Sequence, residues 1–476
     1  MIVIRRVAAV ALTGAVLVTA IVVGAAHAAT LTWDGSCAAM TGDKSWDAQC
    51  RQDVGAEVLT NWDTDTLPGD SADVIIPAAA GQTIIDDPGG ERVNSINSQA
   101  SLHIKGGDAC VVMILSPAAQ STIHDLNLEW GDILVKGTLT LWGTSSMERG
   151  TIYNYEGGGT LINMGDFTIN GVPPDPFANT GLILSQVSNR GTVTQRGHYD
   201  TWDTTISNEG SWLIETNPNE EADFGGSAKP FINRDGADLG KTGAELVYMS
   251  MPLVNEEGGT VIINQGALCL FSEGNKHQGG SIQIDPGAEL ILFEGYPEWG
   301  MPGATLEWTG GSIEYPLPQA GLGVLRVEKS ATMDIRGTAE KTFYKVKLEI
   351  EQGGRVIHAS EGPLVTVGPA VIRNKGIYDL ARGDIKLGLT SDLAPFFENK
   401  GLLRKSKEES GEQTGVSTIE VPVYLEDGGK IEVADRNLTL TGGGEFNGSG
   451  TISVRAQATT WPELILAGSD DLERVY

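Results

Sequence analysis

The residues best suited to catalysis gather in one short polar stretch, residues 196–203. It holds a cation, an imidazole, a phenol, an indole and two carboxylates: Arg196, His198, Tyr199, Trp202, Asp200 and Asp203. Hydrolysis of a glycosidic bond needs two carboxyl groups about 5 to 9.5 Å apart, and elimination needs a base and a cation near the uronate. The stretch therefore predicts a polysaccharide lyase or glycoside hydrolase site, with Trp202 as a binding platform for a sugar ring. The alternative is a polar turn whose aromatic side chains cover the core.

A second candidate site is the Lys276-His277 pair, which lies in the glycine-rich turn 274–280. Its one nearby carboxylate is Glu273, outside the turn. This pair is poorer in catalytic groups than the stretch around His198, so the latter is the preferred site of the enzymatic hypothesis.

Acidic clusters could supply oxygen ligands for calcium, and no other cofactor is indicated. They are Asp63 with Asp65, Asp86 with Asp87, Glu220 and Glu221 with Asp223, and Asp470 with Asp471. None matches an EF-hand loop or a nonapeptide calcium repeat. Calcium thus remains possible, and solvated acidic turns are the simpler interpretation.

The overall charge narrows the range of partners. The 476 residues carry a formal net charge of −29, and 40% of them are hydrophobic. A surface this acidic argues against nucleic acid and anionic lipid as partners, and it repels polyanionic polysaccharides unless calcium bridges them. Neutral glycans or surface polymers fit better.

Residues 1–28 read as a signal peptide. Arg5 and Arg6 precede an uncharged apolar run over residues 7–24, and Ala26-His27-Ala28 supplies a small-x-small cleavage pattern. We therefore expect a secreted, extracellular protein, with the bacterial cell surface as a possible location and no membrane association after cleavage. An uncleaved membrane anchor is the alternative, because 18 residues lie near the lower limit for spanning a bilayer.

The four cysteines fit an exported chain, since oxidising compartments permit disulfides. Cys37 and Cys50 lie 13 residues apart and are expected to pair. Cys110 and Cys269 lie inside apolar runs, where buried free thiols are favoured over a second bridge. The absence of any CxxC spacing excludes a zinc site built from cysteines.

A short motif recurs along the body of the chain: an asparagine, one or two residues, then a glycine. Its asparagines are Asn163, Asn189, Asn208, Asn233, Asn255, Asn374 and Asn399. Successive spacings are 26, 19, 25 and 22 residues up to Asn255, and 25 between the last two. Between the motifs lie alternating runs of three to five residues rich in β-branched side chains, which is the pattern of short strands.

Strands this short cannot bury an apolar face alone, and a period near twenty lets each strand stack on its predecessor in the next coil. The prediction is an all-β, single-stranded right-handed parallel β-helix of about 17 coils, roughly 80 Å long at about 4.8 Å per coil. Its corners are expected to need positive φ, which glycine and asparagine tolerate, and its asparagines to hydrogen-bond from coil to coil. A β-sandwich or propeller is the competing fold.

Residues 29–80 differ from the repeats and are predicted to form an N-terminal cap over the open strand edge, pinned by the disulfide; residues 81–476 form the β-helix. The cap contains Trp33, Trp46 and Trp62, which could alternatively form a carbohydrate-binding face.

The opening of this segment resembles that of secreted bacterial β-solenoid proteins with surface or adhesin-like roles. The resemblance rests on residues 32–35 (Thr-Trp-Asp-Gly), Ser45-Trp46, Asn61-Trp62, residues 67–70 (Leu-Pro-Gly-Asp) and residues 72–76 (Ala-Asp-Val-Ile-Ile). Residues 397–401, 417–423 and 438–450 are similar to repeat units of the same group. The resemblance implies a β-solenoid with a structural or adhesive role, binding glycans or surfaces. An enzyme using residues 196–203 is the alternative, and an enzymatic activity is left undecided.

Overall fold

The computed structural model describes residues 29–51, 58–85, 90–106, 111–118, 120–171, 180–216, 222–226, 228–272, 274–292, 298–299, 304–315, 322–388, 394–407, 415–446, 449–455, 462–467 and 472–475. The predicted signal peptide, residues 1–28, lies outside the described residues. So do Cys110, Glu273 and the acidic residues Asp86, Asp87, Glu220, Glu221, Asp470 and Asp471.

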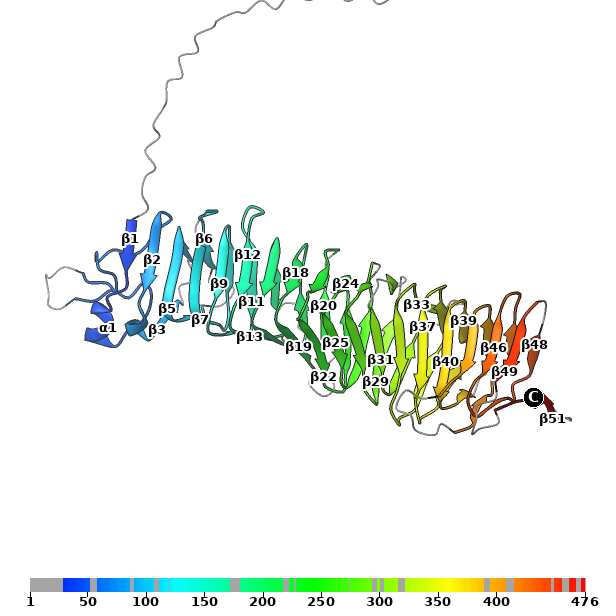
Figure 1. Cartoon of the computed structure of the whole chain (residues 1–476). Helices are drawn as coiled ribbons and strands as arrows, with labels where there is room; N and C mark the ends of the chain where they lie inside the picture. Colours follow the sequence, from blue (N-terminus) through cyan, green and yellow to red (C-terminus); the bar gives the residue numbers. More distant parts are fainter. Residues whose placement is uncertain are drawn as a thin grey trace, which may run out of the picture.

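Short strands stack in parallel along a rod (Figure 1). The strand β12 (Thr160–Asn163) pairs in register with β15 (Gln186–Asn189), and β15 pairs with β18 (Thr205–Asn208) one coil later. Each strand alternates inward and outward side chains, so the period-two sequence pattern places one apolar row inside the coil. The predicted all-β parallel β-helix is confirmed.

Each regular turn of the coil contributes three strands, one to each of three faces. The first face contains β12, β15 and β18; the second contains β13 (Asp166–Asn170), β16 (Thr192–Arg196) and β19 (Ser211–Glu215); the third contains β11 (Gly150–Asn154), β14 (Thr180–Ile183) and β17 (Tyr199–Asp200).

In the described residues this pattern runs for about 14 turns, from β9 (Thr138–Leu141) to β50 (Glu463–Ala467). The spacing predicted about 17 coils. The first coils differ because β5 (Ser95–Ile104) and β7 (Gln120–Leu128) are long strands that each cover two faces.

The N-terminal end carries the short helix α1 (Ser36–Thr41) and the predicted disulfide between Cys37 and Cys50, whose Cα atoms are 5.6 Å apart. Trp62 packs edge-on against Trp33 and Trp46, with ring centroids 5.3 and 4.7 Å apart, and its Nε1–H donates to the carbonyl of Trp46. The strand β1 (Ala29–Thr32) pairs in parallel with β2 (Ala72–Ile76), so this segment joins the first sheet. The domain boundary at residue 80 stays a prediction.

One apolar core fills the coil from end to end. A single cluster of buried side chains extends from Leu31 to Leu464, without a break between separate cores. Because each inward row contacts the rows of adjacent coils, burial is continuous although most of the described strands have only three to five residues.

The expectation that the corner glycines of the Asn-x-Gly motif have positive φ holds for only some of them. Gly236 and Gly258, in the longer Asn-x-x-Gly form, do have positive φ, at 73° and 78°. Gly191 and Gly210 do not, but a Cβ on Gly191 would lie 2.1 Å from the carbonyl oxygen of Gly165, one coil earlier. In the shorter motif, glycine is therefore required by the close approach of consecutive backbones and not by a left-handed conformation.

The motif asparagines form a buried column along the end of the first face. Each side-chain amide donates from Nδ2 to Oδ1 of the next, over 2.7–2.8 Å, in the order Asn163, Asn189, Asn208, Asn233 and Asn255. Each Nδ2 also donates to a backbone carbonyl, which fixes the orientation of the amide. The predicted hydrogen bonding of asparagines between coils is confirmed.

The column continues with His277 on β27 (Lys276–Gln278), whose Nδ1 lies 3.1 Å from Nδ2 of Asn255. The backbone of His277 pairs with that of Trp299 in the next coil. Among the described residues, the next asparagine pair of this kind is Asn374 and Asn399, in which Nδ2 of Asn374 donates to Oδ1 of Asn399. The part of the sequence that lacks the Asn-x-Gly motif thus corresponds to coils of the first face in which the described residues show no asparagine-to-asparagine hydrogen bond.

Candidate functional site

The predicted catalytic stretch turns the corner between β16 and β17, from the second face to the third. Arg196 ends β16 and forms an ion pair with Glu215 on β19, with Nε and Oε2 2.8 Å apart. This pair neutralises the cation that a lyase would direct at a uronate, and it links two consecutive coils.

His198 has two carboxylates around it. Its Nε2 lies 3.5 Å from Oδ1 of Asp200, and Asp223 on β20 (Ala222–Gly225) adds a second negative charge. The hydrogen bond to Asp200 and these charges raise the pKa of His198 above its usual value, although partial burial opposes them. A protonated imidazole near neutral pH serves as an acid better than as the base that elimination requires.

Within the described residues, no hydrogen bond or ion pair joins Asp203 or Trp202 to His198. Asp203 is highly exposed, and its Oδ1 lies 3.7 Å from Nζ of Lys229. Trp202 is 60% exposed, as a binding platform requires. Tyr199 is placed by its backbone alone, which pairs with Phe224 of the next coil, and its side chain lies outside the described part of the chain. The structure thus brings His198 and Asp200 together, and the catalytic role of the stretch stays a prediction.

Asp223 and Ser250 are neighbours of this site that sequence reasoning did not assign to it. The Ser250 hydroxyl donates to Oδ1 of Asp223 over 3.0 Å. The register of β17 with β20 places Asp223 beside His198, so an alignment of consecutive coils is the signal that could have found it.

The second candidate, His277, is buried and forms part of the hydrogen-bonded column that the motif asparagines begin. Burial lowers its pKa to about 4, so the imidazole is neutral. Nδ1 accepts from Asn255, and Nε2–H donates to the carbonyl of Thr305 over 3.2 Å, a tautomer assigned from these partners.

The carboxylates of the acidic pair Asp63 and Asp65 accept hydrogen bonds from backbone amides. Oδ1 of Asp63 accepts from the amide of Thr32, and Oδ1 of Asp65 accepts from that of Thr60. Across the described ranges, no group of three or more histidine, cysteine, aspartate and glutamate side chains is arranged to hold a metal ion.

Cys269 is a free, buried thiol, and burial raises its pKa to about 12. It lies on the outer side of β26 (Gly266–Leu270), in a small apolar cluster with Ala267, Ile291, Leu246 and Tyr248. The expectation of a buried small hydrophobe is confirmed for this cysteine.

This outer apolar cluster borders a pocket of about 440 Å³ that sequence reasoning missed. The pocket crosses three consecutive strands of the third face, β23 (Leu246–Met249), β26 and β29 (Ala288–Leu292). Leu246, Ala267 and Ile291 form its apolar lining, and Glu245, Gln265 and Glu289 its polar lining. Its volume lies within the range typical of small-molecule sites, about 300–1,000 Å³.

The pocket residue Glu289 is influenced by the charge of a carboxylate on the next strand, Glu314. In register, Glu289 faces Ser312 and Ile291 faces Glu314 on β32 (Gly311–Glu314). Burial raises the pKa of Glu289, and the charge of Glu314 raises it further.

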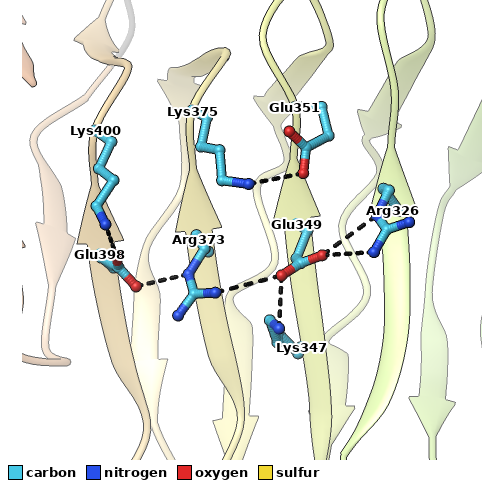
Figure 2. Close-up of polar contacts among 8 residues, drawn as sticks. All are labelled: Arg326, Lys347, Glu349, Glu351, Arg373, Lys375, Glu398 and Lys400. Carbon is cyan, nitrogen blue, oxygen red and sulfur yellow. Dashed lines mark hydrogen bonds and ion pairs between the residues drawn. The ribbon is translucent and has the colours of Figure 1, made fainter.

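The first face of the C-terminal half carries a stripe of alternating charge on its outer side (Figure 2). The strands are β33 (Gly323–Val327), β36 (Val346–Ile350), β39 (Val371–Asn374) and β42 (Phe396–Asn399), and their register aligns Arg326, Glu349, Arg373 and Glu398. Arg326 and Arg373 both contact Glu349, at 3.1 and 3.5 Å, and Arg373 contacts Glu398 at 2.7 Å.

Lysines complete the stripe (Figure 2). Lys347 pairs with Glu349 at 2.6 Å, Lys375 with Glu351 at 2.9 Å, and Lys400 with Glu398 at 2.8 Å. Burial alone would raise the pKa of Glu349, but hydrogen bonds from Lys347 and Arg326 outweigh it and lower that pKa. Each of the three carboxylates of this stripe is thus paired, and its five cations leave a formal excess of two positive charges.

Comparisons with known proteins assign no family. No family model and no curated protein matches the chain. One solved structure, a TibC-catalysed hyper-glycosylated TibA fragment, aligns with 81% of this chain and 93% of its own chain at 13% identity and a TM-score of 0.28. In the described residues, no helix has the length and apolar character needed to cross a membrane.

Proposed function

We propose that this chain is an exported β-solenoid that acts outside the cell or at its surface, in a structural or adhesive role toward glycans or other surface polymers. The observation that carries the proposal is the continuous rod of about 14 regular turns, in which ion pairs such as Arg196–Glu215 and Arg234–Glu256 join adjacent coils. Such a surface is rigid and extended, and it presents repeated side chains along one axis. The apolar run and cleavage pattern in residues 1–28 support export.

A polysaccharide-cleaving enzyme is the second candidate, favoured by the contact between His198 and Asp200 and by the exposed Trp202. In this alternative, His198 acts as the acid that protonates a leaving oxygen, because the raised pKa favours its protonated form. The pairing of Arg196 with Glu215 weighs against a lyase mechanism that uses Arg196 for charge neutralisation.

The test begins with expression in a bacterial host and N-terminal sequencing of the exported protein, which should start after Ala28. Glycan-array binding and reducing-end release are then measured on the same preparation. Binding without cleavage supports the adhesive role. Cleavage that His198→Ala abolishes and His124→Ala preserves would replace it with the enzymatic one, since His124 is an exposed histidine with a similar carboxylate contact at 3.1 Å.

A further inference from the structure

The charged stripe on the first face presents mainly its cations to solvent (Figure 2). Its central carboxylates are largely buried, since the side chains of Glu349 and Glu398 are 8% and 12% exposed. The cations around them reach further out: the side chains of Arg326, Arg373 and Lys400 are 33–45% exposed. The carboxylates therefore hold the cations in place from the side of the sheet, and the surface that a partner would meet is positive.

The two arginines keep hydrogen-bond donors that the carboxylates do not use. Arg326 donates to Glu349 from Nε and Nη2, and Arg373 donates to Glu398 from Nε and to Glu349 from Nη1. In the described part of the chain, Nη1 of Arg326 and Nη2 of Arg373 make no hydrogen bond. Each guanidinium group can thus still donate to an anion from outside the chain.

Among the described residues at the ends of these strands, the charges do not cancel the excess of two positive charges. After β33, Glu328 and Lys329 balance each other, and Lys345, directly before β36, adds one positive charge. Carboxylates follow only after the next strand of the face, β45 (Val423–Leu425), at Glu426 and Asp427. The positive surface thus extends over four consecutive strands.

Two outward aromatic side chains continue the stripe at its C-terminal end. Tyr424 on β45 is in register with Glu398, so it occupies the next position of the same row. Its ring lies edge-on to that of Phe396 on β42, with centroids 5.7 Å apart, and both residues are half-buried. Aromatic rings give the apolar face of a sugar ring a stacking surface, which cations alone do not provide.

The net charge of −29 does not exclude an anion from this place. At physiological ionic strength the Debye length is about 8 Å, so acidic groups elsewhere on the rod are largely screened from the stripe. The local excess is nevertheless small. A duplex nucleic acid carries one charge about every 3.4 Å of each strand, far more than this excess compensates. The stripe therefore suits a sparsely charged polymer.

The spacing of the two arginines indicates how sparse that charge should be. Arg326 and Arg373 occupy the same row two coils apart, which is about 9.6 Å at 4.8 Å per coil. Tyr424 follows Arg373 in that row after two further coils. This distance is close to the length of one disaccharide in an extended glycan, so a chain with one carboxylate per disaccharide matches the row.

We propose that the stripe binds a linear glycan with one carboxylate in each disaccharide, with successive carboxylates at Arg326 and Arg373 and a sugar ring against Tyr424. The inference rests on the proposed glycan-binding function and names the glycan class and the face that binds it. It departs from the expectation of neutral glycans, which followed from the charge of the whole chain and not from its distribution.

The experiment is calorimetric titration of the full exported chain with an octasaccharide of alternating glucuronate and N-acetylglucosamine. The same octasaccharide with methyl-esterified carboxylates keeps the sugar rings without the charge, and it should bind at least tenfold more weakly. Raising the salt concentration from about 0.15 to 1 M should weaken binding of the acidic form, because the Debye length falls to about 3 Å.

The variants separate the stripe from the rest of the surface. Lys375→Gln and Lys400→Gln remove exposed cations with a single partner each, and should weaken binding about threefold singly and about tenfold together. Arg373→Gln should weaken it by about tenfold or more, because it also removes a free donor. Arg234→Gln is the matched control, since Arg234 is 43% exposed and pairs with Glu256 in the other half of the rod. Thermal unfolding of each variant verifies folding.

Equal affinity for the acidic and esterified octasaccharides overturns the proposal, as does binding that Arg373→Gln and the double lysine variant leave unchanged. An equal loss in Arg234→Gln would show that the effect follows the overall charge and not the stripe. Tighter binding of a single-stranded dT octanucleotide than of the octasaccharide would assign the stripe to nucleic acid instead. Glycan-array binding that persists in the stripe variants would leave the adhesive function standing without this site, and the absence of binding to any glycan would remove both.

Discussion

The two halves of the rod use two kinds of contact between coils along the first face, but to different extents. In the N-terminal half, the inner corner carries a buried column of one residue type, from Asn163 to Asn255. In the C-terminal half, the outer side of the same face carries the alternating stripe from Arg326 to Glu398. An amide both donates and accepts, so one residue can repeat in every coil. Like charges about 4.8 Å apart would repel, so a charged row must alternate.

The asparagine column and the charged stripe also differ in their exposure to solvent. The asparagine column lies in the interior, where water cannot satisfy the corner carbonyls and each Nδ2 must do so. The charged stripe lies at the surface, where guanidinium groups remain about one-third exposed and keep part of their hydration. The interior column should therefore contribute more stability per residue and respond less to salt.

The largest effect is expected for Asn208→Leu. Leucine fits the column, since Leu141 precedes Asn163 in the same row, but it leaves Oδ1 of Asn233 and the carbonyl of Asp238 without their donor. At about 1–3 kcal/mol for each buried unsatisfied group, we expect a loss of about 4 kcal/mol in the free energy of unfolding. Urea denaturation measures it.

The control for this substitution is Asn97→Leu at an exposed position with one side-chain hydrogen bond, which should cost less than about 1 kcal/mol. A loss below 1 kcal/mol for Asn208→Leu would mean that the asparagine column contributes little to stability.

The next effect is a pH dependence that originates at His277. Its folded-state pKa of about 4 lies below its usual value of 6.5, so the unfolded chain binds the proton first as the pH falls. The stability that His277 contributes is complete above pH 6.5 and is lost between about pH 6.5 and 4, amounting to roughly 3 kcal/mol at about 1.36 kcal/mol per pKa unit. His277→Asn, which extends the amide column, should remove this part of the acid sensitivity.

The measurement compares the free energy of unfolding at pH 7.5 and 4 for the two proteins, so that other titrating groups cancel. His124→Asn, at an exposed histidine, is the control and should keep the full wild-type slope. An identical loss of unfolding free energy between pH 7.5 and 4 in the wild type and in His277→Asn would show that protonation of the buried imidazole does not contribute to the acid sensitivity.

Much of the first face follows from the sequence, because its signals are local. The Asn-x-Gly motif identified the column, and the 13-residue spacing of Cys37 and Cys50 identified the disulfide. His277 was assigned to a turn because histidine does not match the motif, yet a neutral imidazole replaces the amide acceptor and keeps one donor.

The pocket on the third face could not be found in the same way. Its lining comes from β23, β26 and β29, which meet only through the register of successive coils. The stretch around His198 was found because its residues are adjacent in sequence, but sequence proximity did not reveal that Arg196 and Asp203 would bind Glu215 and Lys229.

A smaller effect is expected from the centre of the charged stripe. Glu349→Gln removes the partner of Arg326, Lys347 and Arg373, but these cations are 24–38% exposed and can regain water. We expect a loss of about 2 kcal/mol at low ionic strength, below the cost of breaking a fully buried pair. In 1 M NaCl the difference from wild type should shrink, because the Debye length falls to about 3 Å. The loss for Asn208→Leu should stay constant with salt, and the opposite pattern would reverse the comparison.

The smallest effect comes from an exposed ion pair on the coils that also carry the asparagine column. Arg190 follows Asn189 directly and pairs with Glu209 over 3.0 Å, with the two side chains 50% and 39% exposed. We expect Arg190→Ala to cost about 0.5 kcal/mol, because solvent screens the pair and both side chains lose rotamer freedom in forming it. Paired with Asn189→Leu in a double-mutant cycle, it tests whether the interior column and the surface pair act independently. Additive losses would place the stability of this half in the buried amides, whereas a coupling above about 1 kcal/mol would mean that the surface pair holds the corner in the geometry that the column requires.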